Sequence, residues 1–477
     1  MKRRKILNKQ QPWTIGRVIF ACLMSLLLLG YFAVMATYSD PTTTGRAFQF
    51  PGYVWILRVI TGVMAIYLGK LWKDKGFRIL AVFLLLKLIR VIAENGDNVF
   101  SEAVSDIMLT GIWVFAACYG MARVFNREQL KRFLNINVAI WTLGMTVSSC
   151  MGIYAAWTGK YIYTIGEGAV WGLPWRSRLF LVYFPTVSGS VASLSAVLAL
   201  CGAIISKRKP GKILFLLSMF PMIVALSLTD SRCAQVTVSA GIAMTAGIFI
   251  LRALRRRAIE KGKKTWSAWV ISITSAGIML VILVFICMKT ITVFNKVRAD
   301  GLLIPRAFAD EVKRKVVSNR GYGGDNVLTS RPQIWRAAIE VLKNNPLFLL
   351  WGASVRSPMT LVNASKIMTF TASHCHCMPL MILLENGIPG LVLAGAFMFR
   401  AATAAFRLVL KAENKRDVLL VPFVVSILLG ELIECFTWLR AGQSPTLPFF
   451  FIAMGIIVVA GQKQNQESMI DMQEIPA

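Results

Sequence analysis

The chain has 477 residues, of which 56% are hydrophobic and 16% are charged. Soluble domains carry about 25% charged residues on average, so this composition excludes an ordinary soluble protein. The 53 basic residues outnumber the 23 acidic ones and give a net charge of +30, which by itself suggests nucleic-acid binding. The basic residues stand in short runs between apolar blocks, however, a pattern typical of membrane topology signals. We therefore expect the bilayer, and no nucleic acid, as a partner.

The apolar residues form blocks of about 20 residues, the length that a helix needs to cross the bilayer core. These blocks predict an all-α polytopic membrane protein with about twelve transmembrane helices. In chain order, the predicted spans cover residues 16–37, 52–70, 78–95, 104–124, 134–156, 183–205, 212–229, 234–252, 267–291, 376–400, 417–436 and 444–461.

The connections between these spans alternate strictly between two kinds. One kind is strongly basic, as in MKRRK at the start, in 206–212 and in 252–264, and the other is mixed or poor in charge. Because Lys and Arg mark cytoplasmic connections, the alternation predicts that both termini are cytoplasmic. The first span is too long for a signal peptide and is expected to be retained.

Four regions follow from this topology. Spans one to nine occupy residues 1–292, and an extracytoplasmic segment occupies 293–375. Spans ten to twelve occupy 376–461, and a cytoplasmic tail occupies 462–477.

The outer segment contains a predicted amphipathic helix over about residues 331–343, near the outer membrane surface. Ser330 and Gln333 have the spacing of a capping box, and Pro332 stands in the first turn. A single apolar stripe then runs along the helix, made of Ile334, Ala337, Ala338, Val341 and Leu342. Farther on, Gly and Pro in 385–390 predict a kink in span ten.

Ionisable residues in or beside membrane spans are costly, and they are therefore the first candidates for function. They gather toward the predicted outer ends of the spans. The candidates are Lys87, Arg90, Asp230, Arg232, Arg331, Arg336, Glu434 and the only two histidines, His374 and His376. Plainer interpretations remain open, since Lys87 and Arg90 could extend toward lipid headgroups and Asp230 could simply pair with Arg232.

Taken together, these residue types favour a lipid-linked phosphate substrate. Arginine binds phosphate through a planar fork, and histidine is the usual general base near neutral pH. The run HCHC at 374–377 also allows a zinc interpretation. Alternating neighbours seldom supply four tetrahedral ligands without a second cluster, so we expect no metal and no cofactor.

Three segments, in order, resemble bacterial O-antigen ligases and O-antigen polymerases. The first is LSLTDSRCAQVTVSAGIAM, which carries a Ser-Arg pair at Ser231 and Arg232. The second is TSRPQIWRAAIEVLKNNPLFLLWGAS, with the motif residues Arg331, Trp335, Pro346 and Gly352. The third places His376 before Gly387 and Gly390 at the family's spacing, which His374 does not have. The resemblance is clearest over residues 220–400.

The resemblance implies a GT-C-like, metal-independent, inverting membrane glycosyltransferase of the bacterial cytoplasmic (inner) membrane. Such an enzyme moves a glycan from undecaprenyl diphosphate to an acceptor hydroxyl outside the cytoplasmic membrane. His376, Arg232 and Arg331 are the expected catalytic residues. Arg336, Lys87, Arg90 and Glu434 are the expected substrate-binding residues. Cys377 stands where the ligases usually have Asn, Ser or Gln, so ligase and polymerase both remain open.

Two other classes of function remain as alternatives. A flippase or transporter of lipid-linked oligosaccharides would place polar residues near the bilayer midplane and would use paired broken helices. The candidates in this chain instead favour the outer ends, and transport leaves the long outer segment unexplained. A structural scaffold would leave the clustered arginines and histidines without a role.

Overall fold

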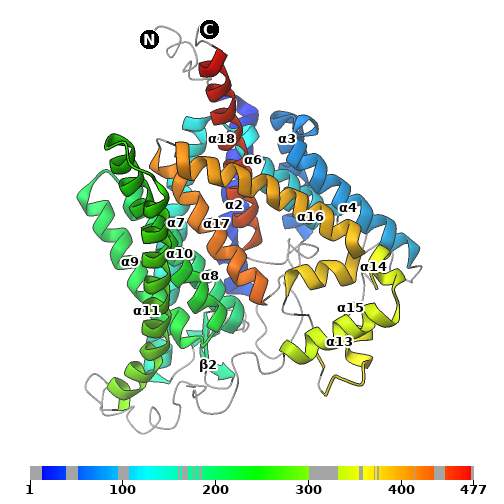
Figure 1. Cartoon of the computed structure of the whole chain (residues 1–477). Coiled ribbons are helices and arrows are strands. Elements are labelled where there is room, and N and C mark those ends of the chain that lie inside the picture. The colour runs from blue at the N-terminus through cyan, green and yellow to red at the C-terminus, as the bar shows by residue number, and fades with distance from the viewer. Residues whose placement is uncertain are drawn as a thin grey trace.

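The computed structural model describes most of the chain in fourteen stretches, and the arrangement of their helices is shown in Figure 1. The described residues are 13–38, 52–94, 107–159, 162–163, 170–175, 178–181, 185–299, 331–353, 358–369, 371–372, 375, 377–412, 414–434 and 446–473. Ser330, His374 and His376 lie outside them.

A helix or helix pair overlaps each of the twelve predicted spans. These elements are α2 (Ile15–Tyr38), α3 (Gly52–Gly69), α4 (Lys75–Ala93), η2 with α6 (Ile107–Cys118 and Tyr119–Val124), α7 (Arg127–Thr158), α8 (Pro185–Ile205), α9 (Lys209–Leu228), α10 (Arg232–Glu260), α11 (Trp266–Ala299), α16 (Met378–Lys411), α17 (Lys415–Glu434) and α18 (Leu447–Gln473). Among the described residues, six of these helices, α7 to α11 and α16, are long and apolar enough to cross a membrane. The helical membrane architecture is confirmed, and the exact number of spans stays a prediction.

The outer surface of the bundle is apolar, as lipid contact requires. On α9, Ile213, Leu217 and Phe220 are all more than half exposed, and on α11 the same holds for Val281 and Phe285. Such contiguous apolar surface is unfavourable in water. A bilayer would cover it, which explains why these helices have no polar face.

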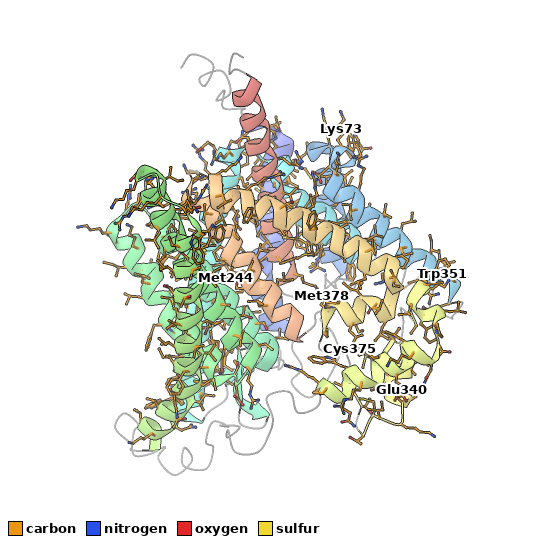
Figure 2. The ribbon with its side chains drawn as sticks, viewed as in Figure 1. Lys73, Met244, Glu340, Trp351, Cys375 and Met378 are labelled. Atoms are coloured by element: carbon orange, nitrogen blue, oxygen red, sulfur yellow. The ribbon has the colours of Figure 1, made fainter. Side chains whose placement is uncertain are left out.

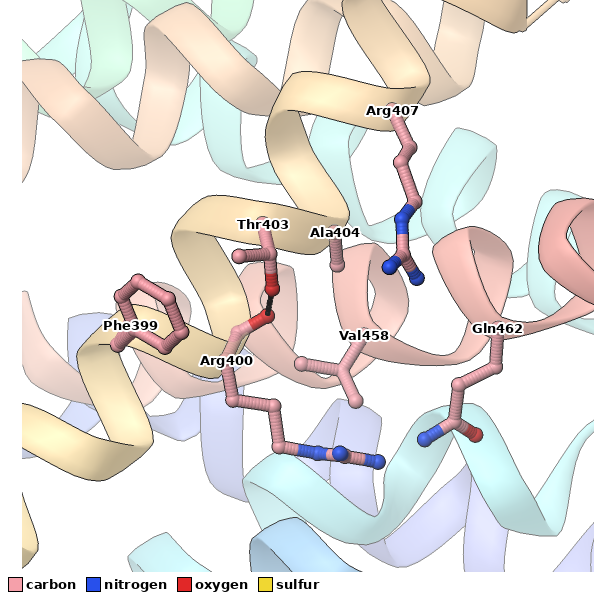
Figure 3. A pocket seen from close by; sticks show the side chains of 7 residues that line it. All are labelled: Phe399, Arg400, Thr403, Ala404, Arg407, Val458 and Gln462. Atoms are coloured by element: carbon pink, nitrogen blue, oxygen red, sulfur yellow. Dashed lines mark hydrogen bonds between the residues drawn. The ribbon is translucent and has the colours of Figure 1, made fainter.

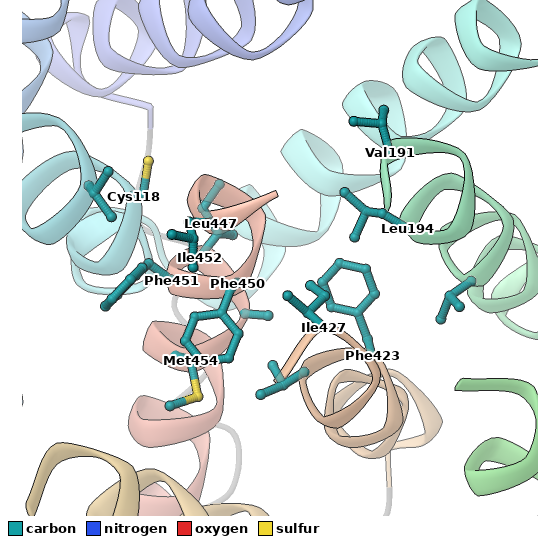
Figure 4. Packing of buried hydrophobic residues seen from close by; sticks show 14 of the residues in the cluster. Cys118, Val191, Leu194, Phe423, Ile427, Leu447, Phe450, Phe451, Ile452 and Met454 are labelled. Atoms are coloured by element: carbon teal, nitrogen blue, oxygen red, sulfur yellow. The ribbon is translucent and has the colours of Figure 1, made fainter. Parts of the chain in front are cut away.

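The core is formed by large apolar side chains from helices distant in the sequence, and Figure 4 shows α8, α17 and α18 contributing to it. Phe115 lies 5.3 Å from Phe451, and Tyr119 lies 5.6 Å from Phe397, between ring centroids. The indole N–H of Trp141 on α7 donates to Ser195 Oγ on α8 at 2.9 Å. The two aromatic contacts join the two halves of the chain into one bundle.

Most of the basic connections lie together at one end of the bundle. Arg127, which begins α7, forms a 2.8 Å ion pair with Asp417, which lies in the first turn of α17. Arg255 near the end of α10 donates to Leu410 O at 2.8 Å. The sequence placed these connections on one side of the membrane from charge alone, and the contacts agree with that placement.

The all-α prediction describes the bundle, but the stretch between α7 and α8 also contains strands that the sequence did not predict. Three short antiparallel strands lie there in the order β1 (Ile162–Tyr163), β2 (Val170–Trp175) and β3 (Arg178–Leu181). Trp171 anchors the sheet to α7, because its indole donates to Ser148 Oγ at 3.0 Å. Aromatic residues favour strands, and Pro174 coincides with the irregular register between Gly172 and Trp175.

The segment before α16 forms three helices at the end of the bundle opposite to the basic connections (Figure 1). They are α13 (Arg331–Asn344), α14 (Leu347–Trp351) and α15 (Pro358–Ala364). The buried residues of α13 are Ile334, Ala337, Ala338, Val341 and Leu342, the five residues of the apolar stripe. Packing against the bundle, rather than helix propensity alone, therefore orients α13.

Candidate active site

The first two turns of α13 carry two site residues that are four positions apart. Arg331 is the first residue of the helix, and Trp335 follows one turn later. Residues at this spacing lie on the same side of a helix. Each side chain contacts a different, sequence-distant segment that sequence analysis had connected with the site.

Arg331 contacts the start of α10. Its Nη2 atom lies 3.8 Å from Cys233 Sγ, and Cys233 directly follows Arg232. Arg232 is half-buried and is the first helical residue of α10 after the N-cap residue Ser231. Two of the predicted catalytic arginines therefore begin two helices whose first turns meet.

This arrangement concentrates positive potential at one place. The first N–H groups of a helix carry a partial positive charge, so a cation is unfavourable there and an anion is favourable. Arg331 and Arg232 each add a guanidinium to such a helix start. An anion between the two starts would receive backbone N–H groups together with the planar fork of Arg331, which lies against α10.

Trp335 contacts the described residue that lies between the two histidines in sequence. Its indole N–H donates to Cys375 O at 2.9 Å, and Cys375 is the residue before His376. The backbone of Ala372 is held in turn by Asn363, which donates to Ala372 O and accepts from Ala372 N, both at 2.9 Å. Cys377, on the other side of His376, is the N-cap residue of α16.

The His376 side chain itself lies outside the described residues. Figure 2 shows its described neighbour Cys375 beside Met378, the first residue of α16. The contact of Trp335 with this segment was not foreseen from the residues. The family resemblance did include Trp335, which is the signal that could have identified it.

The Cys375 thiol is a structural group. Its side chain is fully buried, and Sγ lies 3.5 Å from Met359 Sδ. Burial raises the pKa of this thiol to about 12, with smaller contributions from Cys377 and Glu385, so it stays protonated at neutral pH. Zinc binds the thiolate form, so Cys375 is poorly suited as a ligand. In the part of the chain that the structure describes, no three His, Cys, Asp or Glu residues gather closely enough to hold a metal ion.

Two glycines let the outer helices pack directly onto α16. Gly352 has a φ of +85° and Gly387 a φ of +63°. A Cβ atom on Gly352 would lie 2.4 Å from Glu385 O, and one on Gly387 would lie 2.7 Å from Leu349 O. Gly387 interrupts α16, so the kink predicted for this stretch is confirmed.

Arg90 supports the same contact from α4. Its Nη2 atom donates to Gly352 O at 3.3 Å and lies 3.5 Å from Glu94 Oε1. Lys87, one turn earlier, is 3% exposed, so the interpretation that it extends toward headgroups is wrong. Arg90 therefore supports the outer helices, and direct contact of Lys87 or Arg90 with a substrate stays a proposal.

The remaining two candidates are less closely joined to this group. Arg336 is exposed on α13, on the face away from the buried stripe. Glu434 is the last residue of α17, and its side chain lies outside the described set. Their assignment to substrate binding therefore rests on the sequence.

One of two comparisons with known proteins found a match, and it overlaps this region. A search among curated proteins found no match. Residues 217–395 match a family model described as O-antigen ligase, and the matched range contains Arg232, Arg331 and His376. It also contains α13 and the glycine contact between α14 and α16. Over residues 217–395 this chain is therefore similar to the O-antigen ligase family.

Proposed function

We propose that the protein is a membrane glycosyltransferase that moves a glycan from undecaprenyl diphosphate to an acceptor hydroxyl outside the cytoplasmic membrane. Its acceptor would be a lipid A core, as for a ligase, or a second lipid-linked repeat unit, as for a polymerase. The match to the O-antigen ligase family over residues 217–395 supports a role in glycan transfer within a membrane.

One observation carries the proposal. Through Arg331 and Trp335, a single helix contacts the residue after Arg232 and the residue before His376. Fixed cations and a base near one another are what transfer from a diphosphate donor needs, since most of the catalysis comes from positioning and electrostatic stabilisation.

The proposed reaction is an inverting displacement at the anomeric carbon. The acceptor oxygen forms a bond to that carbon while the bond to the diphosphate oxygen breaks on the opposite face. The acceptor proton passes to His376 as general base. Arg232 and Arg331 stabilise the charge that develops on the departing diphosphate, where preorganised donors are most effective in a water-poor site.

The other predicted residues have supporting roles in this proposal. Lys87 and Arg90 would contribute positive charge behind the diphosphate, and Arg336 would contact the donor or acceptor from the exposed face of α13. Glu434 would orient His376. No metal is required, because the arginines supply the charge stabilisation that a divalent ion provides in other transferases.

The charge pattern supports a location in the bacterial cytoplasmic membrane with the site on the outer side. The basic connections lie together at one end of the bundle, and α13 lies at the other. The positive-inside rule makes the basic end cytoplasmic. The donor glycan would then meet its acceptor on the extracytoplasmic side.

The test is a transfer assay with the purified protein in lipid nanodiscs. A glycan on undecaprenyl diphosphate would be offered with either a lipid A core or a second lipid-linked unit, each with and without a chelator. We expect a new glycosidic product with one acceptor and equal yield with chelator. Movement of intact donor across vesicle membranes, with no product from either acceptor, would instead support a flippase and overturn the proposal.

A further inference from the structure

A second polar site lies at the basic end of the bundle, away from α13. A cavity of about 220 Å³ opens between α16 and α18, and Figure 3 shows the residues that line it. Sites for drug-sized ligands occupy about 300–1,000 Å³. The volume therefore suits a headgroup rather than a whole lipid or a glycan.

The cavity is lined by hydrogen-bond donors. Arg400 and Arg407 come from α16, and Gln462 comes from α18. Gln462 Oε1 accepts from Arg123 Nη2, and Figure 3 shows its amide nitrogen turned toward Arg400. None of the described lining residues is acidic. The cavity is therefore built for an anion.

The guanidinium of Arg400 is not fully used by the protein. Its Nε atom is buried and has no hydrogen-bond partner within the described chain. Among the described residues, neither Arg400 nor Arg407 forms an ion pair. A buried donor without a partner is unfavourable, and a bound anion would satisfy it.

Apolar side chains beside the cavity indicate where the anion comes from. Phe399 lines the cavity and is 72% exposed, and Phe406 on the same helix is 55% exposed. Arg252 and Arg255 donate to the last carbonyls of α16, at Ala412 and Leu410, so this end of α16 lies with the basic connections. The cavity thus lies where a lipid headgroup, with its acyl chains against aromatic rings, would meet the protein.

We propose that this cavity binds the phosphate of an anionic phospholipid from the cytoplasmic leaflet. Basic pockets between transmembrane helices on that side are suited to anionic headgroups, and arginine forks match phosphate oxygens. The site is separate from the proposed glycosyl transfer, because α13 lies at the other end of the bundle. Binding would join α16 to α18 and stabilise the folded protein.

Native mass spectrometry and thermal unfolding of the purified full chain test this proposal. The probes are phosphatidylglycerol, phosphatidylcholine of the same acyl chains, and inorganic phosphate. We expect retained phosphatidylglycerol and a raised unfolding temperature, with little effect of the other two. Arg407→Gln should weaken phosphatidylglycerol binding about fivefold, and the double variant with Arg400→Gln about 30-fold, taking about 1 kcal/mol for each charge.

The control is Arg257→Gln, which removes an exposed charge near the end of α10 that does not line the cavity. Because Arg407 is exposed, its substitution should not affect folding, so the test survives if the double variant does not fold. Equal weakening by the control would show a diffuse charge effect and overturn the proposal. Equal stabilisation by phosphatidylcholine, or by inorganic phosphate alone, would overturn it as well.

Discussion

The two ends of the helix bundle use arginine differently. At the basic end, Arg123, Arg127 and Arg255 contact carboxylates or carbonyls of other connections, and these contacts hold the helix ends together. At the opposite end, Arg232 and Arg331 begin helices that meet through Cys233. The positive charge of the connections therefore agrees with the predicted topology, whereas the meeting of the two helix starts that carry Arg232 and Arg331 supports the proposed anion site.

The largest expected effect is a loss of glycan transfer on substitution at the outer end of the bundle, where the proposed site lies. His376→Ala should lower glycan transfer by about 10²- to 10⁴-fold, because a general base contributes about that much. His374→Ala is the matched control and should keep near-normal rates, since only His376 has the family spacing to Gly387 and Gly390. Both variants should be folded and inserted. Equal losses in the two would remove His376 from its special role.

Gly352→Ala tests whether the outer helices depend on their backbone contact with α16. Its φ of +85° costs a side chain about 1–2 kcal/mol, and overpacking against Glu385 O costs about 1–3 kcal/mol more. We expect a clearly lowered unfolding temperature in detergent and reduced transfer. Gly395→Ala is the control, because a Cβ there meets nothing within 4 Å. Unfolding temperatures that match between the two variants would contradict the proposed close packing.

At the basic end of the bundle, the pH dependence of stability tests the role of Asp74. Burial by itself raises the pKa of Asp74, but hydrogen bonds from Phe77 N, Tyr119 and Arg123 outweigh it and hold the pKa below its usual value. The carboxylate therefore stabilises the fold above its unfolded pKa of about 3.9, and this stabilisation is lost as pH falls through the lower folded pKa.

Asp74→Asn should accordingly cost about 1–3 kcal/mol at pH 7, and its unfolding temperature should approach that of the unchanged protein on strong acidification. Glu128→Gln is the control, because Glu128 is exposed and pairs with Lys131 at the surface, where ion pairs contribute little. A gap between Asp74→Asn and the unchanged protein that persists to pH 2 would count against the ionic role of Asp74.

The smallest expected effect tests whether Trp335 positions the segment before His376 at the outer end of the bundle. Trp335→Phe keeps the aromatic packing and removes the N–H that donates to Cys375 O. Losing about 1 kcal/mol of hydrogen bonding at the segment before His376 should lower kcat about fivefold with little change in KM. Trp351→Phe, at a residue that is 54% exposed, should have no such effect. Identical kcat values for the two variants would show that Trp335 does not position the histidine segment.

Sequence patterns were sufficient for the helices and insufficient for the small sheet. Apolar blocks and basic connections are local, so they located the membrane helices, and the Gly and Pro residues of 385–390 located the kink. The strands at 162–181 were missed because each is short and gains its stability from packing on α7. From the sequence, Lys87 could have extended toward the lipid headgroups, because charge alone does not show that a side chain is buried.

The sequence by itself determined that this is a helical membrane protein, which residues are its candidate arginines and histidines, and which family motifs contain them. Only the tertiary structure decided which distant segments lie beside the described candidates. Arg331 and Cys233 are 98 residues apart, Trp335 and Cys375 are 40 apart, and Arg90 and Gly352 are 262 apart. Local periodicity is fixed by the backbone geometry of each segment. Contacts across such separations depend on how whole helices pack, which no single segment encodes.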